Sequence, residues 1–98
     1  MIHMVIVNHN PETCAVNVPE NRKKAQEAYQ MMPEAAKKLG ATLQGGWVNA
    51  PAHTFYFVID APNAHVVNDL MRDLRFMDWN TVTISPVVTI QEAASRSR

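Results

Sequence analysis

The stretch that decides the fold is IHMVIVNH, residues 2–9, near the start of the chain. Val5 and Val7 share one face of an extended chain, because side chains alternate along a strand. Met4 and Ile6 share the other face. A strand that is apolar on both faces lies in the middle of a sheet and is covered twice. We therefore expect this strand to be central and both of its faces to be buried.

The rest of the chain predicts two helices, three further strands and a short closing helix. Their expected places are a helix from Asn17–Glu20 to Gly40, strands at 41–49, 53–61 and 79–88, a helix capped by Asn63 between the last two strands, and a closing helix opened by Thr89 and Glu92. The two pairs Asn17 with Glu20 and Thr89 with Glu92 have the spacing of a capping box. Pro33 lies inside the first helix, where a proline costs about 3 kcal/mol. We therefore expect a kink at residues 31–32 or two helical pieces end to end.

This order, βαββαβ, predicts an α+β fold of the ferredoxin-like kind. Right-handed crossovers give an antiparallel four-stranded sheet with both helices on one face. A length of 98 residues fits one domain, residues 1–98, with a short C-terminal helix and a frayed tail from about residue 90. The second apolar face of the central strands needs a cover. Pairing of two sheets about a two-fold axis would supply it, so we expect a homodimer, a dimeric α/β barrel.

The composition of the chain limits the classes of partner that it can bind. Lys and Arg together number 9, as do Asp and Glu, so no net field favours nucleic acid or an anionic membrane. The N-terminal residues lack both a signal-peptide pattern and a spanning run, which predicts a cytoplasmic protein. The single cysteine, Cys14, has no partner for an internal disulfide. It is a buried small side chain, a metal ligand or a reactive thiol.

Two segments carry a resemblance to a known family. The stretches GGWV, residues 45–48, and WNTVTISPVVTIQEAA, residues 79–94, resemble small domains of the dimeric α/β-barrel superfamily. The resemblance implies a ferredoxin-like dimer with a cavity between sheet and helices or at the barrel mouth. Relatives in that superfamily include cofactor-free monooxygenases, lactone isomerases and haem-binding enzymes. Asn8, Trp47 and His65 match residue types of such monooxygenases, but their spacing differs, so those roles do not transfer.

One polar grouping stands out near a predicted rim of the sheet. The end of the first strand should lie beside the start of the third, which brings His9, Cys14 and His53 together. Imidazole and thiolate bind zinc, copper or haem iron, and Glu12 or Asn10 could complete the set. The alternative is structural: His9 caps backbone groups of the loop and Cys14 packs beneath it.

Other residues suggest further sites. A ligand pocket is predicted around Asn8, Trp47, Tyr56 and Trp79. His3 and His65 fall at the opposite rim and form a second, weaker site. The doublet Gly45-Gly46 lies within a strand and not before a helix, which predicts a bulge or a close backbone approach beside Trp47.

Three functions are compatible with these features. The first, which we favour, is a dimeric protein that binds a metal or a small apolar ligand at the His9, Cys14 and His53 rim. The second is a cofactor-free or haem-dependent monooxygenase or isomerase acting on a small apolar substrate, with His9 or His53 as general base. The third is a structural or regulatory assembly module.

Overall fold

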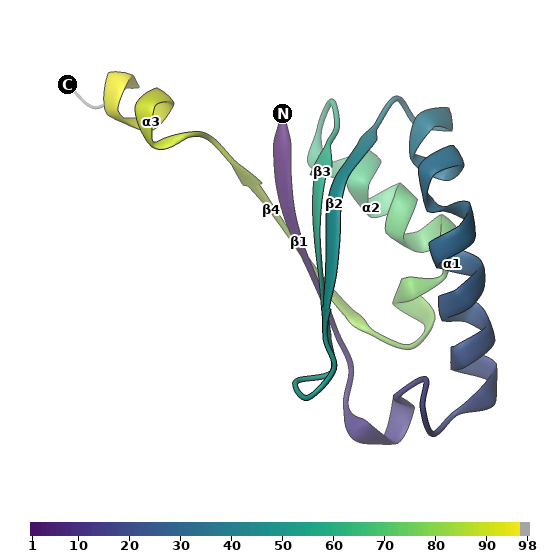
Figure 1. Ribbon diagram of the computed structural model, residues 1–98. Helices are drawn as coiled ribbons and strands as arrows, with labels where there is room; N and C mark the ends of the chain where they lie inside the picture. The colour runs from purple at the N-terminus through teal and green to yellow at the C-terminus, as the bar shows by residue number, and fades with distance from the viewer. Residues whose placement is uncertain (97–98) are drawn as a thin grey trace.

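The sheet has the strand order β2-β3-β1-β4, and each pair of neighbours is antiparallel (Figure 1). This is seen in a computed structural model of the protein, which describes residues 1–96. The elements are β1 (Ile2–Asn8), η1 (Pro11–Thr13), α1 (Pro19–Lys38), β2 (Thr42–Asn49), β3 (Thr54–Asp60), α2 (Ala64–Asp73), η2 (Phe76–Asp78), β4 (Thr81–Val87) and α3 (Ile90–Arg96). The predicted α+β fold with βαββαβ order is confirmed.

Two layers form the body of the molecule. Helices α1 and α2 lie on the same face of the sheet (Figure 1), and the core is enclosed between them and the sheet. The core side chains with no more than 1% exposure are apolar and come from both layers: Val5, Val7, Ala36, Ile59, Val67, Leu70, Met71 and Phe76. The core therefore lies wholly on the helix side of the sheet.

The central strand β1 is apolar on both faces but covered on only one. Val5 and Val7 on the helix side are buried. Met4 and Ile6 on the outer side are 41% and 40% exposed. The central position predicted for this strand is confirmed. Its outer face, which we expected to be buried, is not covered by any of residues 1–96 of the same chain.

Helix α1 differs from expectation at two points. Its N-cap is Val18, which makes no side-chain capping hydrogen bond, and Asn17 instead donates its amide to the carbonyl of Pro11. The predicted capping by Asn17 is wrong, because the helix begins at Pro19 with Val18 as its N-cap and the Asn17 amide is bonded within the preceding loop. Pro33 lies within one continuous helix, so two separate pieces are excluded. Burial of an apolar stripe along α1 outweighs the local cost of the proline.

The closing helix α3 begins as predicted and leaves the body of the domain. Thr89 accepts from the N–H of Glu92 at 3.0 Å, and the Glu92 carboxylate accepts from the N–H of Thr89 at 3.4 Å, which confirms this capping box. Helix α3 projects beyond the end of β4 on the side of the sheet opposite α1 and α2 (Figure 1). The last two residues of the predicted frayed tail, 97–98, lie outside the described residues.

Within residues 1–96, no helix has both the length and the apolar character needed to cross a membrane.

Leu70 tests whether the layer between α2 and the sheet determines stability. Its side chain is fully buried, so Leu70→Ala should lower the free energy of unfolding by about 2–5 kcal/mol through lost burial and a cavity. Met31→Ala, at a position that is 56% exposed on α1, should change it by less than about 0.5 kcal/mol. Urea denaturation followed by circular dichroism measures both. Equal effects would contradict the core described above.

Candidate metal centre

Three potential ligands meet at one rim of the sheet. His9 directly follows β1, Cys14 directly follows η1, and His53 directly precedes β3. Strand pairing brings the two histidines together, since Asn8 is the partner of Thr54 in the antiparallel register. One ligand atom from each of His9, Cys14 and His53 lies within 4.8 Å of the others. The structure thus places these three predicted residues in one cluster.

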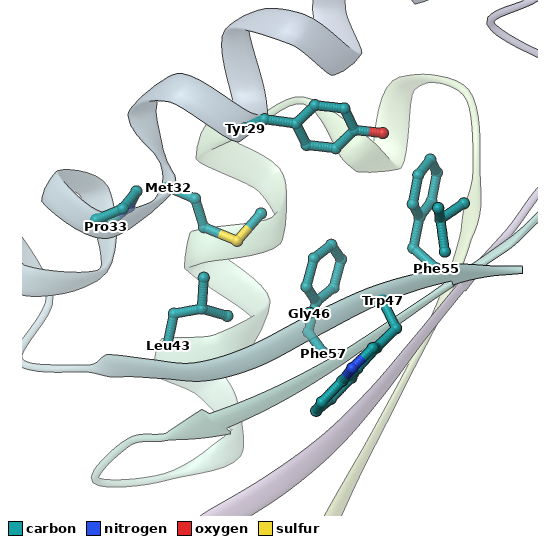
Figure 2. A pocket seen from close by; sticks show the side chains of 9 residues that line it. Tyr29, Met32, Pro33, Leu43, Gly46, Trp47, Phe55 and Phe57 are labelled. Atoms are coloured by element: carbon teal, nitrogen blue, oxygen red, sulfur yellow. The ribbon is translucent and has the colours of Figure 1, made fainter.

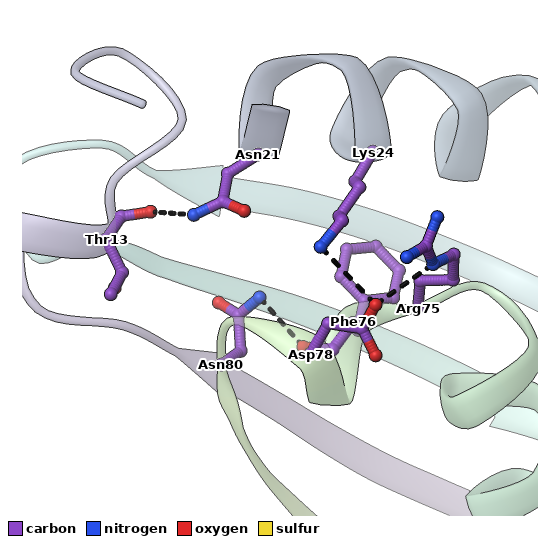
Figure 3. Close-up of polar contacts among 7 residues, drawn as sticks. All are labelled: Thr13, Asn21, Lys24, Arg75, Phe76, Asp78 and Asn80. Atoms are coloured by element: carbon purple, nitrogen blue, oxygen red, sulfur yellow. Dashed lines mark hydrogen bonds and ion pairs between the residues drawn. The ribbon is translucent and has the colours of Figure 1, made fainter. Parts of the chain in front are cut away.

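The network around His9 fixes which ring nitrogen carries the proton. The amide of Asn80 donates to the carbonyl of Phe76 at 3.1 Å (Figure 3), so the Asn80 oxygen faces the histidine. His9 Nδ1 lies 2.9 Å from that oxygen and must be the donor, so Nε2 is the ring nitrogen available as a metal ligand. His9 is only 9% exposed, and its Nε2 is buried without a hydrogen-bond partner among the described residues. The ring is therefore fixed in orientation through Nδ1, while Nε2 faces the cluster region without a partner in the described part of the chain.

His53 is held by its backbone in an unusual conformation. Its φ is 52°, in the left-handed region that side chains with a Cβ seldom adopt. Its carbonyl accepts from the N–H of His9 at 3.2 Å, and the Asn8 amide donates to Thr54 Oγ1 at 2.8 Å and contacts the same carbonyl. These bonds place the two rings in an edge contact with centroids 5.3 Å apart. His53 Nδ1 is buried and, within residues 1–96, also has no partner.

Cys14 lies in a loop that is fixed at several points. Its carbonyl accepts from the N–H groups of Asn17 and Val18, each at 2.9 Å. Just before it, the carbonyl of Thr13 accepts from the buried amide of Asn21 at 2.8 Å (Figure 3). The thiol is free and buried, with 9% exposure. The loop therefore presents the sulfur at a defined place beside the imidazoles.

The segment η2 forms the wall behind His9. The Trp79 ring lies 5.0 Å from the His9 ring, centroid to centroid, so Trp79 lies at the rim predicted for it. Asp78 accepts from Arg75 at 2.9 Å and pairs with Lys24 of α1 at 3.4 Å (Figure 3). These contacts attach η2 to α1 and so hold Trp79 and Asn80 against His9.

The three donors are one too few for a structural metal site in which protein ligands fill every position. Zinc bound for structural purposes takes four protein ligands, whereas three leave a position for water or another ligand. Glu12, proposed as a completing residue, is exposed and absent from the grouped donors. The Asn10 oxygen already accepts from the N–H of Thr13 at 3.0 Å. The cluster therefore offers two nitrogens, one sulfur and one open position.

Two cavities adjoin the cluster between α1 and β2. The first, of about 320 Å³, is lined by all three cluster residues and by Tyr29, Val48 and Phe55 among others. The second, of about 350 Å³, shares those last three residues and extends to Met32, Leu43 and Phe57 (Figure 2). Burial raises the pKa of the Tyr29 hydroxyl above its ordinary value, so it stays protonated at neutral pH.

The glycine doublet explains why space remains beside β2. The register shifts between Leu43 and Gly45, and a Cβ at Gly45 would lie 2.5 Å from the Trp47 ring. A Cβ at Gly46 would lie 3.0 Å from Phe57. The predicted bulge and close approach beside Trp47 are confirmed. Sequence reasoning named Trp47, which lines the second cavity, but missed Tyr29, Val48 and Phe55. The signal that was available is the missing side chain at Gly46.

The other predicted site residues are not gathered in this way. Trp47 and Tyr56 lie opposite each other on the outer face of the sheet, where they are 60% and 38% exposed, whereas Trp79 is buried on the helix side. Asn8 holds the turn before β3. Asn8 and Trp79 line one cavity beside His9, and Trp47 lines the cavity shown in Figure 2. His3 is fully buried with Nδ1 3.4 Å from the carbonyl of Ile59, and His65 is exposed on α2.

Comparison with known proteins identifies a family but no activity. A family model described as a domain of unknown function, DUF3303, matches residues 1–97. No curated protein matches the chain.

The left-handed backbone of His53 gives a test that needs no metal. His53→Gly should be more stable than His53→Ala by about 1 kcal/mol, because alanine is strained at this φ and glycine is not. In the exposed helical position of His65 the order should reverse by a similar amount, since glycine weakens a helix. Thermal and urea unfolding in the presence of chelator compare the four variants. The same order at both positions would contradict the conformation of His53.

Proposed function

Since the chain belongs to the DUF3303 family, whose description names no function, we propose from the site itself that it is a metal-binding protein. The metal is a borderline divalent cation, zinc foremost, bound by His9 Nε2, Cys14 Sγ and His53 Nδ1. The fourth position is left for a small ligand from the adjoining cavity.

The observation that carries this proposal is that two buried imidazole nitrogens without partners belong to residues of one donor cluster. His9 Nε2 and His53 Nδ1 both lack a hydrogen bond within the described part of the chain. A buried polar group left unpaired costs about 1–3 kcal/mol, and each of the two histidines contributes a ring nitrogen to the same 4.8 Å grouping as the Cys14 thiol. A cation there would satisfy both lone pairs at once, which the structural alternative does not do.

The surroundings of His9 also resemble those of metal-bound histidines. Such a histidine commonly donates its other ring nitrogen to an oxygen, which fixes the ring and raises its basicity. Asn80 supplies this oxygen at 2.9 Å from His9 Nδ1. A sulfur and two nitrogens are ligands that suit zinc and copper and disfavour magnesium and calcium.

Titration with metal tests the proposal. Zinc at about 100 times its dissociation constant should raise the free energy of unfolding by about 2.7 kcal/mol, and cobalt should give the colour of thiolate ligation. Cys14→Ser and His53→Asn should each weaken binding at least about a hundredfold, since each removes a ligand; asparagine also tolerates the left-handed φ. His65→Asn, on an exposed helix surface, is the matched control.

The proposal fails if zinc and cobalt neither bind nor stabilise the wild-type protein. It also fails if His65→Asn weakens binding as much as His53→Asn does, because the metal would then be bound elsewhere. In either case His9 would remain as a buried imidazole that lines a cavity, which is the feature that favours an enzyme of the isomerase or monooxygenase type.

We further propose that the protein is a homodimer joined through the outer sheet faces. The support is an apolar patch on that face, formed by Met4, Ile6, Trp47 and Tyr56, together with α3, which extends on the same side (Figure 1). Contiguous exposed apolar surface of this kind marks an interface, and a two-fold pairing would make one patch cover its copy. The dimeric α/β-barrel superfamily that the sequence resembles has this arrangement.

Charge reversal on the patch tests the dimer. Ile6→Glu should convert the protein to monomers at micromolar concentration, because a pair of carboxylates would face each other near the two-fold axis. Met31→Glu, at a position that is 56% exposed on α1, should leave the dimer intact. Sedimentation equilibrium measures both. A wild-type protein that sediments as a monomer would disprove the proposal.

A further inference from the structure

The two cavities beside the metal centre form one cleft between α1 and β2. Both are lined by Tyr29, Val48 and Phe55, so they adjoin along these residues. Their volumes, about 320 and 350 Å³, each fall within the range of small-molecule sites. The cleft therefore has a ligating end and an apolar end.

At the apolar end of the cleft, no side chain of β2 fills the space beside Phe57. Gly46 places no side chain on the helix side of β2, where a Cβ would press on Phe57 at 3.0 Å. Figure 2 shows Tyr29 and Met32 of α1 on one side and Leu43 and Phe57 of the sheet on the other, with the space between them. A lining of this kind excludes a charged or strongly hydrated ligand and favours a hydrocarbon chain or ring.

The end of the cleft at His9, Cys14 and His53 favours an anionic group on the ligand. A divalent cation held by one thiolate and two neutral imidazoles keeps one positive charge. In a buried site a monoanionic donor compensates that charge better than water does. The open fourth position lies in the cavity lined by His9, Cys14 and His53, so an anionic head at the metal would place its tail toward Tyr29 and Phe55.

We infer that the site binds a monoanionic amphiphile, a medium-chain or aryl carboxylate, whose head completes the metal coordination and whose tail occupies the slot lined by Met32, Leu43 and Phe57. This inference rests on the proposed metal site. The half-exposed Tyr29, whose ring lies 6.0 Å from that of Phe55, separates the two ends and would turn to admit the tail.

The experiment uses cobalt-loaded protein titrated with sodium octanoate and sodium acetate, monitored by the cobalt absorption bands. Both anions bind through a carboxylate, so a difference in affinity reports on the hydrocarbon tail alone. Octanoate should bind at least about tenfold more tightly than acetate, since its additional methylenes leave water. Leu43→Trp should fill the slot and lower the affinity for octanoate to about that for acetate. Thr42→Trp, the exposed neighbour on the same strand, should retain the preference.

The outcomes separate the two proposals. Failure of cobalt to bind would overturn the metal site itself. Cobalt binding with equal affinity for the two anions would overturn the amphiphile inference alone, as would an octanoate preference that survives Leu43→Trp. If Leu43→Trp does not fold, nuclear Overhauser contacts between octanoate and Met32 or Phe57 in the zinc-loaded wild type decide instead, and their absence would contradict the inference.

Discussion

The rest of the structure depends on the antiparallel pairing of β1 with β3. This pairing runs from Ile2 opposite Asp60 to Asn8 opposite Thr54, so it fixes both the inner row of core side chains and the point where each strand enters its loop. A slip of one residue would turn every side chain to the other face. It would then move Val5 and Val7 out of the core and separate His9 from His53.

The same pairing links stability to the candidate site. The N–H of His9 donates to the carbonyl of His53, so the two imidazoles are neighbours because the sheet ladder continues one step past the strands. The Asn8 side chain closes the turn on the outer side. Ligands held by such backbone bonds lose little freedom on binding a metal, and preorganisation of this kind favours affinity.

The two faces of the sheet have different roles. The helix side holds the core, and toward the edge strand β2 it opens into the cleft, because Gly46 places no side chain there. The outer side carries exposed apolar side chains, among them Trp47 and Tyr56, which lie opposite each other on β2 and β3. We propose that the covered face of the sheet holds the ligand site and that the outer face is the assembly surface.

The sequence by itself determined the element order, the central place of β1 and β3, and the convergence of His9, Cys14 and His53. The alternation of apolar and polar side chains identifies the strands, and the order of strands and helices along the chain leaves few possible topologies. It did not determine the uncapped start of α1, since burial of a long helical stripe outweighs a missing cap. Only the tertiary structure decided that Asn80 orients the His9 ring from 71 residues away in the sequence. It also decided that Tyr29, Val48 and Phe55 line a cleft, because a cavity is the space that packed elements leave between them and no single segment encodes it.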